Sequence, residues 1–480
     1  MNDMTKIDRP DRCPGMTYTD MLEGDTRRAP DYLLMESNQE LGDEPLSTDR
    51  YTSAEFAALE EARMWPNIWQ FVAREEDMPE PGDTFVYDIN DRSYLLVRQR
   101  DASVKAFHNV CLHRGRKLRT SSGNAINLRC PFHGFTWNND GSLKEIPCAW
   151  DFQHLKEKDM SLPELRVDQW QGFILVTENA DIPAFVDWVG PGVEHYENWR
   201  LDECYTGAWI GRVIPANWKA VAEAFMEAWH TVVTHPQILG FLGDANTRYD
   251  LYGDHMNRAI TPSGVLSPHI RGKDQNYILK AMADFSGGKD NEASRRFNAG
   301  DNDHGHALDD PYMARKVLAD ASRKGFHEAN GRDYSAVTDS EMLDNFTYNI
   351  FPNWAPWGGF VPNIVYRWRP WGDADHCMME VRILMRTREG EAAPKGPEMF
   401  RIGDDRPFSD AAHLIGAALA SIFDQDMENL PFVQEGMKAS KTKVIELGTY
   451  QESRLRHFHQ TIDKYISGEL PVSGGLPNQG

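Results

Sequence analysis

The sequence predicts an α+β protein in which a small all-β domain precedes a larger domain with an antiparallel sheet flanked by helices. Three observations favour this fold class. Residues 69–176 contain short apolar segments separated by turn residues. After residue 176 the segments are longer and mix helical and strand patterns. The chain has 480 residues with 41% apolar content, which is enough for a large core in about two or three domains.

Residues 1–64 are predicted to be a helical segment that packs on the larger domain. Ser53 is a typical helix N-cap, and Glu55 lies in the first turn that would follow it. Pro66 disfavours a helical conformation of the residue before it, so we expect the helix to end near Trp65. We therefore place the first domain boundary between residues 64 and 65.

Residues 65–178 are predicted to form the all-β domain. The dipeptides Pro81-Gly82 and Asp140-Gly141 supply turn chemistry between apolar runs. The expected strands cover residues 69–72, 84–87, 94–97 and 172–176. Short strands that follow one another with turns between them indicate a compact sheet domain.

Residues 179–480 are predicted to form the larger domain. The expected elements are helices at residues 218–234 and 410–430 and strands at residues 365–370 and 377–385. Between these elements, residues 243–344 are polar and rich in Gly, Asp, Asn and Arg. We interpret this part as an insert that could act as a lid, because active sites are often covered by movable loops.

The composition excludes several classes of partner. A formal net charge of -22 disfavours nucleic acid, since such binding depends on phosphate neutralisation by clustered Lys and Arg. The longest weakly apolar run, residues 414–423, is shorter than the roughly 20 residues that cross a bilayer. The first residues lack the pattern of a secretory signal. We expect a cytoplasmic protein without a nucleic-acid or membrane partner.

Two short segments each combine one cysteine with one histidine. The first contains Cys111 and His113, and the second contains Cys130 and His133. Two such segments can hold two irons asymmetrically, as in a Rieske centre, where histidines replace cysteines on one iron. A structural zinc site is the alternative. Zinc fingers, however, usually carry both cysteines in one segment and both histidines in the other.

A basic patch surrounds these segments in an otherwise acidic chain. It consists of Arg114, Arg116, Lys117, Arg119 and Arg129. The patch is either a solvated charged loop or a docking surface for an acidic electron-transfer protein that is steered by opposite charge.

A second group of metal-binding residue types begins after Asn217. If this stretch is helical, steps of four and three residues place Glu223, Glu227 and His230 along one stripe. The proline that follows His235 is expected to end the helix, so a turn could bring His235 back towards His230. Two imidazoles and a carboxylate can form a facial triad on iron, with open positions for dioxygen.

Two alternatives apply to this second group. Zinc accepts two histidines and a carboxylate as well. Glu223 could also pair with Lys219 one helical turn earlier, which would give it a structural role. The first site favours iron, because an electron-transfer cluster needs an electron acceptor in the same protein.

The helix expected at residues 410–430 offers the carboxylate of the triad. Its apolar residues form a stripe that Asp426 continues at i+4 from Ile422 and i+3 from Phe423. A carboxylate on a buried face is costly unless it is paired or binds metal, so Asp426 is the predicted ligand. Asp424 lies off the stripe and is predicted to be solvated. Pro431 is expected to kink this helix.

Three sequence motifs carry a family resemblance. They are HNVCLHRG at residues 108–115, CPFHGFTWNNDGSL at residues 130–143, and NWK at residues 217–219 followed by an acidic residue and His-x4-His. With these motifs the chain resembles the large (alpha) subunits of Rieske non-haem iron ring-hydroxylating oxygenases. The resemblance implies a 2Fe-2S Rieske cluster bound by Cys111, His113, Cys130 and His133. It implies mononuclear Fe(II) bound by His230, His235 and Asp426.

The same resemblance assigns a catalytic role to Glu227. It would be the carboxylate that links the cluster of one subunit to the iron of its neighbour. Most members of the family have Asp at this position, so Glu227 is a departure. Two further departures are Trp137, where a Tyr is usual, and Ala224, where an Asn is often found near the iron.

The resemblance implies a terminal oxygenase component. Electrons from NAD(P)H would arrive through a reductase, with or without a ferredoxin. Dioxygen would be used to mono- or dihydroxylate an aromatic or other small hydrophobic compound. The expected assembly is a homotrimer, with or without a small beta subunit. A Rieske O- or N-demethylase is the alternative, and a zinc-stabilised binding protein without redox chemistry is a third hypothesis.

The substrate pocket is expected beside the second metal site. Its predicted lining consists of Ile238, Leu239, Phe241, Leu242 and residues 351–354. An apolar, aromatic wall would suit a hydrophobic substrate. Ordinary core packing is the alternative for each of these residues. The sequence leaves the identity of the substrate open.

Overall fold

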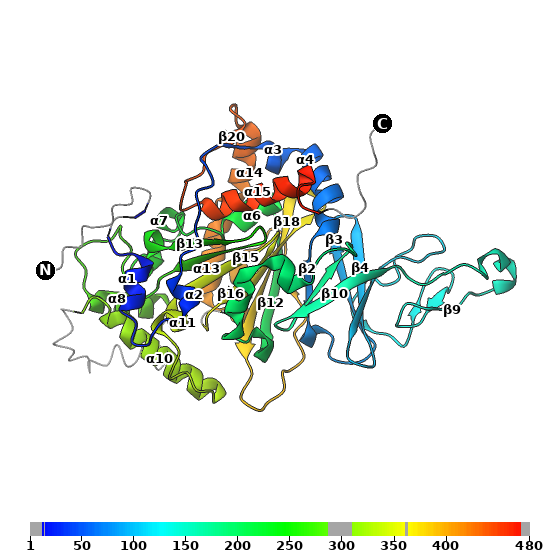
Figure 1. The fold of residues 1–480 in the computed structure, drawn as a ribbon, viewed down its shortest axis with the longest axis horizontal. Helices are drawn as coiled ribbons and strands as arrows, with labels where there is room; N and C mark the ends of the chain where they lie inside the picture. The colour runs from blue at the N-terminus through cyan, green and yellow to red at the C-terminus, as the bar shows by residue number, and fades with distance from the viewer. Residues whose placement is uncertain (1–11, 14, 287–309, 361–362, 472–480) are drawn as a thin grey trace.

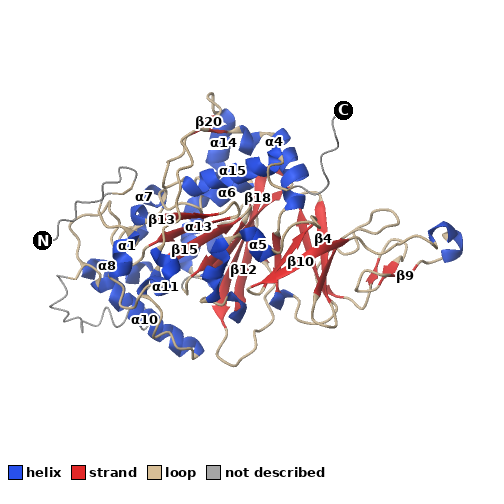
Figure 2. Cartoon of the chain, viewed as in Figure 1, coloured by secondary structure: helices blue, strands red, loops and turns tan. Residues whose placement is uncertain are grey.

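The computed structural model describes residues 12–13, 15–286, 310–360 and 363–471. Two large sheets organise the chain, one of seven strands and one of eight (Figure 1). Helices gather over the eight-stranded sheet, whereas the outer part of the seven-stranded region consists mostly of strands and loops (Figure 2). Within the described ranges, no helix is both long enough and apolar enough to cross a bilayer.

The N-terminal segment runs over the larger sheet and its helices (Figure 1). Its elements are α1 (Tyr18–Glu23), α2 (Asp31–Leu34), β1 (Leu46–Ser47), α3 (Asp49–Thr52), α4 (Ala54–Leu59) and a π-helical turn (Glu60–Met64). The hydroxyl of Ser53 caps α4 by accepting a hydrogen bond from the backbone N–H of Phe56 at 3.2 Å. The hydroxyl of Tyr18 donates to Asp344 at 2.9 Å, which ties the segment to the larger domain. The boundary at residue 64 itself stays a prediction.

The seven-stranded sheet forms the core of the small domain. Its strand order is β2-β11-β10-β5-β4-β3-β6, and every neighbouring pair is antiparallel. The strands are β2 (Gln70–Arg74), β3 (Asp83–Ile89), β4 (Arg92–Arg98), β5 (Val104–His108), β6 (Gly123–Asn124), β10 (Glu164–Trp170) and β11 (Phe173–Thr177). All four strands expected from the sequence in this region lie in the sheet, since their apolar residues face its core.

A three-stranded sheet projects from the small domain at one end of the molecule (Figure 1). It consists of β7 (Leu128–Arg129), β8 (Thr136–Trp137) and β9 (Leu143–Glu145). Trp137 is fully buried there, and its indole N–H donates to the carbonyl of Met160 at 2.7 Å. A tryptophan therefore fits the position where the resemblance leads one to expect a tyrosine.

The eight-stranded sheet is the centre of the larger domain. Its order is β13-β14-β15-β16-β17-β18-β12-β19, antiparallel except for the pairing of β12 with β19. The strands are β12 (Cys204–Ile214), β13 (Arg248–Tyr252), β14 (Met256–Thr261), β15 (Asn345–Ile350), β16 (Trp354–Gly358), β17 (Ile364–Trp371), β18 (Asp373–Arg386) and β19 (Phe400–Arg401). The two expected strands correspond to β17 and β18.

Further helices and a short strand complete the described chain. They are α5 (Phe185–Val189), α6 (Trp218–Glu223), α7 (Thr231–Thr234), α8 (Gln275–Phe285), α10 (Met313–Asn330), α11 (Asp339–Leu343), α12 (Ala412–Ile415), α13 (Ala417–Met427), α14 (Leu430–Ala439), β20 (Val444–Ile445) and α15 (Ser453–Ser467). Strand β20 pairs with β1 of the N-terminal segment. In Figure 1, α6, α14 and α15 lie over one side of the eight-stranded sheet.

Strand β17 shows how the eight-stranded sheet is covered on both faces. Tyr366 points towards α13, where its ring centroid lies 6.0 Å from that of Phe423. Arg367, one residue later, points the opposite way and donates to the carbonyls of Phe71 and Val72 in β2. Because successive residues of a strand face opposite sides, one face of the sheet meets the helices and the other meets the small domain.

The contact between the two sheets corrects one part of the predicted pocket. The ring of Trp354 lies 5.2 Å from Phe71 and 4.8 Å from Phe173, so it packs against the small domain. Phe351 stacks on Tyr465 of α15 at 5.4 Å. The prediction that residues 351–354 line a substrate pocket is therefore wrong for Phe351 and Trp354. These two aromatic side chains are buried in contacts inside the protein instead.

Only part of residues 243–344 lies outside the central sheet. Strands β13 and β14 belong to the central sheet, so the interpretation as an insert is wrong for residues 248–261. Their polar residues are buried in ion pairs, such as Arg258 with Asp250 at 2.6 Å. Paired charges can occupy a core position that an unpaired charge cannot. Residues 287–309 of the predicted lid lie outside the described residues.

Candidate metal centres

The two Cys-His segments of the small domain fold into loops with the same backbone pattern. In the first loop, the N–H of Cys111 donates to the carbonyl of Arg116 at 2.8 Å, and the N–H of Gly115 donates back to Cys111 at 3.0 Å. In the second loop, Cys130 and Gly134 repeat both bonds at 2.8 Å and 3.0 Å. Both glycines have positive φ angles, of 74° and 81°, which favour glycine because it has no Cβ.

The side chains of the two loops converge. The rings of His113 and His133 have centroids 4.6 Å apart, and both cysteines are buried. The Nδ1 atom of His113 is buried and has no hydrogen-bond partner among the described residues. Burial, together with the charges of His133 and Arg114, lowers the pKa of His113, which favours the neutral ring that binds metals. An orphaned ring nitrogen beside a second imidazole and two thiols fits a metal cluster.

Without a metal ion, the raised pKa of the Cys111 thiol keeps it protonated. Burial raises the pKa of the Cys111 thiol, and the neighbouring Cys130 thiol raises it further. A thiolate here would therefore be unfavourable unless a cation stabilised it. Bound metal ions deprotonate coordinating thiols, so this pair of cysteines is suited to the role that the sequence assigns to it.

The basic patch around these loops is partly engaged within the chain. Lys117 pairs with Asp88 at 2.9 Å, and the side chain of Arg116 donates to the backbone carbonyl of Lys117. Arg114 lies over the ring of Phe132, at 5.3 Å from its centroid. Phe132 and His133 are exposed to solvent. The patch thus has both a local structural role and an accessible surface, and its docking role stays a prediction.

The second site begins with a break in the predicted helix. The prediction of one helix over residues 218–234 is wrong, because α6 ends at Glu223 and α7 starts at Thr231. Between them the carboxylate of Glu227 accepts hydrogen bonds from the backbone N–H groups of Trp229 and His230. A side chain that binds local N–H groups in this way competes with the helix for the same donors.

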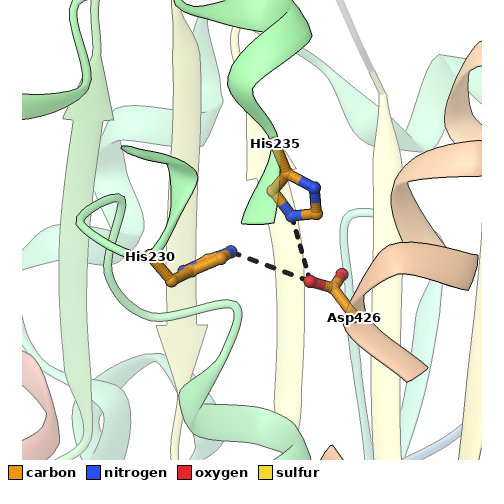
Figure 3. A group of neighbouring side chains, drawn as sticks. All are labelled: His230, His235 and Asp426. Carbon is orange, nitrogen blue, oxygen red and sulfur yellow. Dashed lines mark ion pairs between the residues drawn. The ribbon is translucent and has the colours of Figure 1, made fainter. Parts of the chain in front are cut away.

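Three residues from two distant parts of the chain meet at this site (Figure 3). The Nε2 atom of His235 lies 3.0 Å from Oδ1 of Asp426, and the Nε2 atom of His230 lies 3.8 Å from the same oxygen. One ligand atom from each side chain lies within 4.8 Å of the other two. Two imidazoles and one carboxylate at this separation match the donor set of a mononuclear iron site with open positions.

The opposite ring nitrogens of both histidines are also bound. Nδ1 of His230 lies 2.6 Å from Oε1 of Glu227, and Nδ1 of His235 lies 2.9 Å from Oε1 of Gln425. An oxygen acceptor at Nδ1 holds the proton there and leaves the lone pair of Nε2 for a metal. Sequence reasoning did not identify Gln425. Its position directly before Asp426 was the available signal.

The charges around His230 favour a cation at this site. Burial of the His230 ring opposes protonation, but the hydrogen bond and charge of Glu227 outweigh burial and raise the pKa of the ring. The charge of Asp426 acts in the same direction. A metal ion at Nε2 would take the place of that proton, with Asp426 as a ligand and Glu227 holding the opposite ring nitrogen.

The helix that carries Asp426 is interrupted on both sides. The prediction of one helix over residues 410–430 is wrong, because Gly416 has a φ of 86° and separates α12 from α13. Pro431 lies in the first turn of α14 and begins a new helix instead of kinking one, since that position needs no N–H donor. Asp426 is 4% exposed and points into the protein from α13, as predicted.

One predicted side-chain environment is wrong, and one alternative is excluded. Asp424 is not simply solvated, because it accepts hydrogen bonds from the backbone N–H groups of Phe408 and Ser409 at 2.5 Å and 3.1 Å. Glu223 does not pair with Lys219, which binds Glu60 at 2.8 Å. Both cases involve partners far away in sequence, which local spacing could not indicate.

Glu223 belongs to a buried polar cluster instead. Its carboxylate accepts from the hydroxyl of Tyr51 at 3.0 Å and lies 2.7 Å from Nε2 of His459. Tyr51 comes from α3 and His459 from α15, so the cluster joins both ends of the chain to α6. It places Glu223 outside the group of metal-binding side chains.

Aromatic side chains from three elements pack near the triad. Phe225 follows α6, Tyr366 and Trp368 come from β17, and Phe423 precedes Asp426 by one turn of α13. Ring centroids of Phe225 lie 4.8 Å from Tyr366 and 5.4 Å from Trp368. Burial raises the pKa of Tyr366 well above its usual range, and the charge of Asp426 raises it further. Leu239, Phe241 and Leu242, which the sequence suggested as lining, are buried in the core.

Family models match most of the chain. A model described as "Ring hydroxylating alpha subunit (catalytic domain)" matches residues 192–468, which is more than half of the sequence. A model described as "Rieske [2Fe-2S] domain" matches residues 68–156. The cysteine and histidine loops lie inside the second match, and the two-histidine triad lies inside the first.

Two curated relatives are similar over part of their length. The chain is 28% identical over 194 residues to the carnitine monooxygenase oxygenase subunit of Acinetobacter baumannii, covering 39% of this chain and 51% of that protein. It is 33% identical over 184 residues to the large oxygenase component of the naphthalene 1,2-dioxygenase system of Ralstonia sp, covering 36% and 40%. The chain spans about half the length, or less, of these relatives.

Solved structures are similar over almost the whole fold. A quaternary ammonium Rieske monooxygenase superposes with a TM-score of 0.60 at 16% identity, covering 88% of this chain and 95% of that chain. Naphthalene 1,2-dioxygenase with indole bound gives a TM-score of 0.61 at 18% identity, covering 89% and 93%. These likenesses confirm the predicted α+β fold, with a small β domain and a larger sheet flanked by helices.

Proposed function

Because the chain belongs to the family of ring-hydroxylating alpha subunits, we propose that it is the terminal component of a Rieske non-haem iron oxygenase. One observation carries the proposal. A sulfur-and-nitrogen donor set in the small domain occurs together with a triad of two histidines and one carboxylate in the larger domain. These donor sets suit different metals, and an oxygenase of this kind needs both.

We assign each group of residues to a cofactor. Cys111, His113, Cys130 and His133 would hold a 2Fe-2S Rieske cluster, and His230, His235 and Asp426 would hold mononuclear Fe(II). When bound, the cluster supplies single electrons and the mononuclear iron supplies open positions for dioxygen. The protein orients the ligands, because Glu227 fixes the ring of His230 and Gln425 fixes the ring of His235. Residues 65–178 and 179–480 are the proposed domains.

The placement of the two sites supports an assembly of several subunits. In Figure 1 the sheet of β7, β8 and β9 lies at one end of the chain and α7 lies towards the other. Electron transfer between sites so placed is easier between neighbouring subunits than within one. Apolar residues next to both sites are exposed, namely Phe132 at 56%, Trp229 at 52% and Val233 at 83%. We propose a homotrimer, with or without a small beta subunit.

Glu227 is the proposed catalytic carboxylate between subunits. It binds His230 on one side and lies next to the exposed Trp229. From this place it could reach a histidine of the small domain of a neighbouring subunit. The longer side chain, compared with the usual Asp, is accommodated here because its carboxylate folds back onto the N–H groups of Trp229 and His230.

The electron source and the substrate are proposed by chemical class. Electrons would come from an NAD(P)H-dependent reductase, with or without a ferredoxin, docking near the exposed His133 and its basic neighbours. The substrate would be an aromatic or other small hydrophobic compound, since Phe225, Tyr366 and Phe423 present ring surfaces near the triad. The cytoplasmic location stays a prediction that cell fractionation would test.

Spectroscopy of the protein tests the proposal before any substrate is known. Anaerobically purified enzyme should show the visible absorption of a Rieske cluster and, after reduction, its electron paramagnetic resonance signal. Metal analysis should give iron and not zinc. A colourless, zinc-containing protein without that signal would overturn the oxygenase proposal in favour of a zinc-stabilised binding protein.

Product analysis then separates the possible reactions. A screen of hydrophobic compounds, coupled to oxygen uptake, should identify a substrate whose product gains one or two oxygen atoms. A gain of one oxygen indicates monohydroxylation, and a gain of two indicates dihydroxylation. Loss of a methyl group with release of formaldehyde would instead assign O- or N-demethylation to the same triad.

A further inference from the structure

Two buried side chains hold the backbone on either side of Glu227. The carbonyl of Met226 accepts a hydrogen bond from Nη1 of Arg454 at 2.8 Å. The N–H of Ala228 donates to the hydroxyl of Tyr249 at 3.2 Å. Arg454 lies at the start of α15 and Tyr249 lies in β13, so two elements distant in sequence fix one short segment.

The Glu227 segment needs such support because no helix contains it. Helix α6 ends at Glu223 and α7 begins at Thr231. The carboxylate of Glu227 orders only the residues that follow it, through Trp229 and His230. The N–H of Met226 donates to the carbonyl of Glu223 at 2.9 Å, and the carbonyl of Ala228 accepts from the N–H of Thr231 at 3.3 Å. Arg454 and Tyr249 add hydrogen bonds from elements that are distant in sequence.

Arg454 is itself held in a fixed orientation. It is fully buried, Nε donates to Asn257 at 2.6 Å, and Nη1 also donates to Thr347 at 3.1 Å. Its Nη2 atom is buried and has no hydrogen-bond partner among the residues that the structure describes. A buried guanidinium with an unused donor is costly for stability. The hydrogen bonds of Nε and Nη1 nevertheless fix the orientation of the guanidinium beside Met226.

Burial and nearby charges act on Arg454 in opposite directions. Burial lowers the pKa of Arg454 to about 9, against the charge of Glu227, which raises it. The side chain thus remains a cation at neutral pH, and the charge of Glu227 acts on it. Tyr249 is also buried, and its ring meets that of Tyr450 edge-on at 5.2 Å.

We infer that Arg454 and Tyr249 are positioning residues that set the place of the Glu227 carboxylate. The inference rests on the proposed function for the catalytic meaning of that place, but not for the contacts themselves. Arg454 fixes the backbone before Glu227 and Tyr249 fixes it after, so a shift of either would move the carboxylate relative to His230 and the subunit surface. A supporting shell of this kind holds a functional side chain in its productive geometry.

The test uses Arg454→Lys and Tyr249→Phe in the full-length protein. Lysine keeps the charge of Arg454 but loses its fork of donors, and phenylalanine removes only the acceptor for Ala228. Arg456→Lys is the matched control. Arg456 lies on the same helix, is also buried, and donates to the carbonyl of Glu44 at 2.5 Å.

The first readout is hydrogen exchange, which does not depend on activity. In both test variants the peptide containing residues 226–230 should exchange roughly fivefold to tenfold faster, as expected for the loss of one hydrogen bond. The Arg456→Lys protein should exchange in this peptide like the parent. Equal protection of the peptide in all three variants would overturn the inference.

The second readout separates this inference from the proposed function. The cluster is reduced with dithionite, and its reoxidation by dioxygen is followed by visible absorption with and without mononuclear iron. We expect the iron-dependent part of the rate to fall about tenfold in Arg454→Lys and less in Tyr249→Phe. If Glu227→Gln abolishes this part while Arg454→Lys behaves like Arg456→Lys, only the positioning role fails. If Glu227→Gln leaves it unchanged, the proposed role of Glu227 fails.

Discussion

The candidate cluster loops and the candidate iron triad differ in how much of the chain each one needs. Each loop closes on itself through two backbone hydrogen bonds and a glycine, within six consecutive residues from Cys111 or Cys130. The triad brings His230 and His235 of one region together with Asp426 of another. The first site is therefore largely a local structure, whereas the second exists only when the larger domain is folded.

The two sites therefore depend on different residues. The loops depend on their own ligands and glycines. The triad depends also on the side chains that orient it, among them Glu227, Gln425 and the residues that hold their backbone. Substitutions in the larger domain should separate the two sites, because they can remove one metal and leave the other in place.

The largest expected effect comes from Asp426→Ala. The variant removes one of three ligand side chains, so about one iron atom per chain should be lost while the cluster is retained. Metal analysis and the resonance signal of the reduced cluster measure the two separately. Asp424→Ala is the control, since this residue caps a 3-10 turn and lies outside the triad. Retention of all iron in Asp426→Ala would move the ligand role to another residue.

Glu227→Gln should slow turnover while the cluster stays in place. The substitution keeps the length of the side chain but removes the charge beside His230. We expect NADH-driven turnover to fall by about 10–100-fold, the usual range for a residue that supports a metal ligand. The cluster spectrum should persist. Glu435→Gln, on the exposed side of α14, is the control. Parent-like turnover of Glu227→Gln would remove its bridging role.

Gln425→Leu should weaken iron binding through a single histidine, His235. The amide oxygen of Gln425 binds Nδ1 of His235 at 2.9 Å and also accepts from Gln237 at 2.7 Å. Without this acceptor the ring of His235 is less well oriented, and iron affinity should fall about tenfold in a chelator competition. Gln237→Leu leaves the acceptor of His235 in place and should bind iron like the parent. Equal losses in both variants would indicate a packing effect instead.

The sequence predicted the local cluster loops better than the long-range contacts around the triad. The cluster loops and the strands near them depend on contacts between residues close in sequence, so their spacing was informative. Asp426 was also predictable, because a carboxylate on an apolar stripe is unusual. The break in the helix at Glu227 was not, since it depends on hydrogen bonds that compete with the helix only in this setting. The ligand roles themselves remain proposals until metals are measured.

Long-range partners account for the remaining errors. Glu223 binds Tyr51 and His459, which lie near opposite ends of the chain. Trp354 packs on Phe71 and Phe173 of the small domain, so an aromatic residue that suggested a pocket fills an interface instead. Residue spacing carries no information about such partners. Only the folded chain determines which polar or aromatic side chains Glu223 and Trp354 contact.

The smallest expected effect on catalysis concerns the junction of the two regions. Glu380 on β18 is 2% exposed and binds Arg367 at 2.6 Å and Arg369 at 2.8 Å. Arg367 also donates to the carbonyls of Phe71 and Val72 in β2. The ion pairs of Glu380 therefore hold the arginine that joins the small domain to the larger sheet.

This junction should give the fold a specific dependence on acid. Burial opposes ionisation of Glu380, but Arg367 and Arg369 outweigh it and lower its pKa from 4.5 to about 2. Its stabilising contribution is complete above pH 4.5 and is lost as the pH falls towards 2. Glu380→Gln should lack this dependence and lose about 3–5 kcal/mol of unfolding free energy at pH 7, because two buried cations lose their partner. Urea unfolding at several pH values measures both effects. The same acid dependence in parent and variant would show that another carboxylate controls the junction. Loss of the acid dependence in the variant alone would identify Glu380 as the group that joins the small domain to the larger domain.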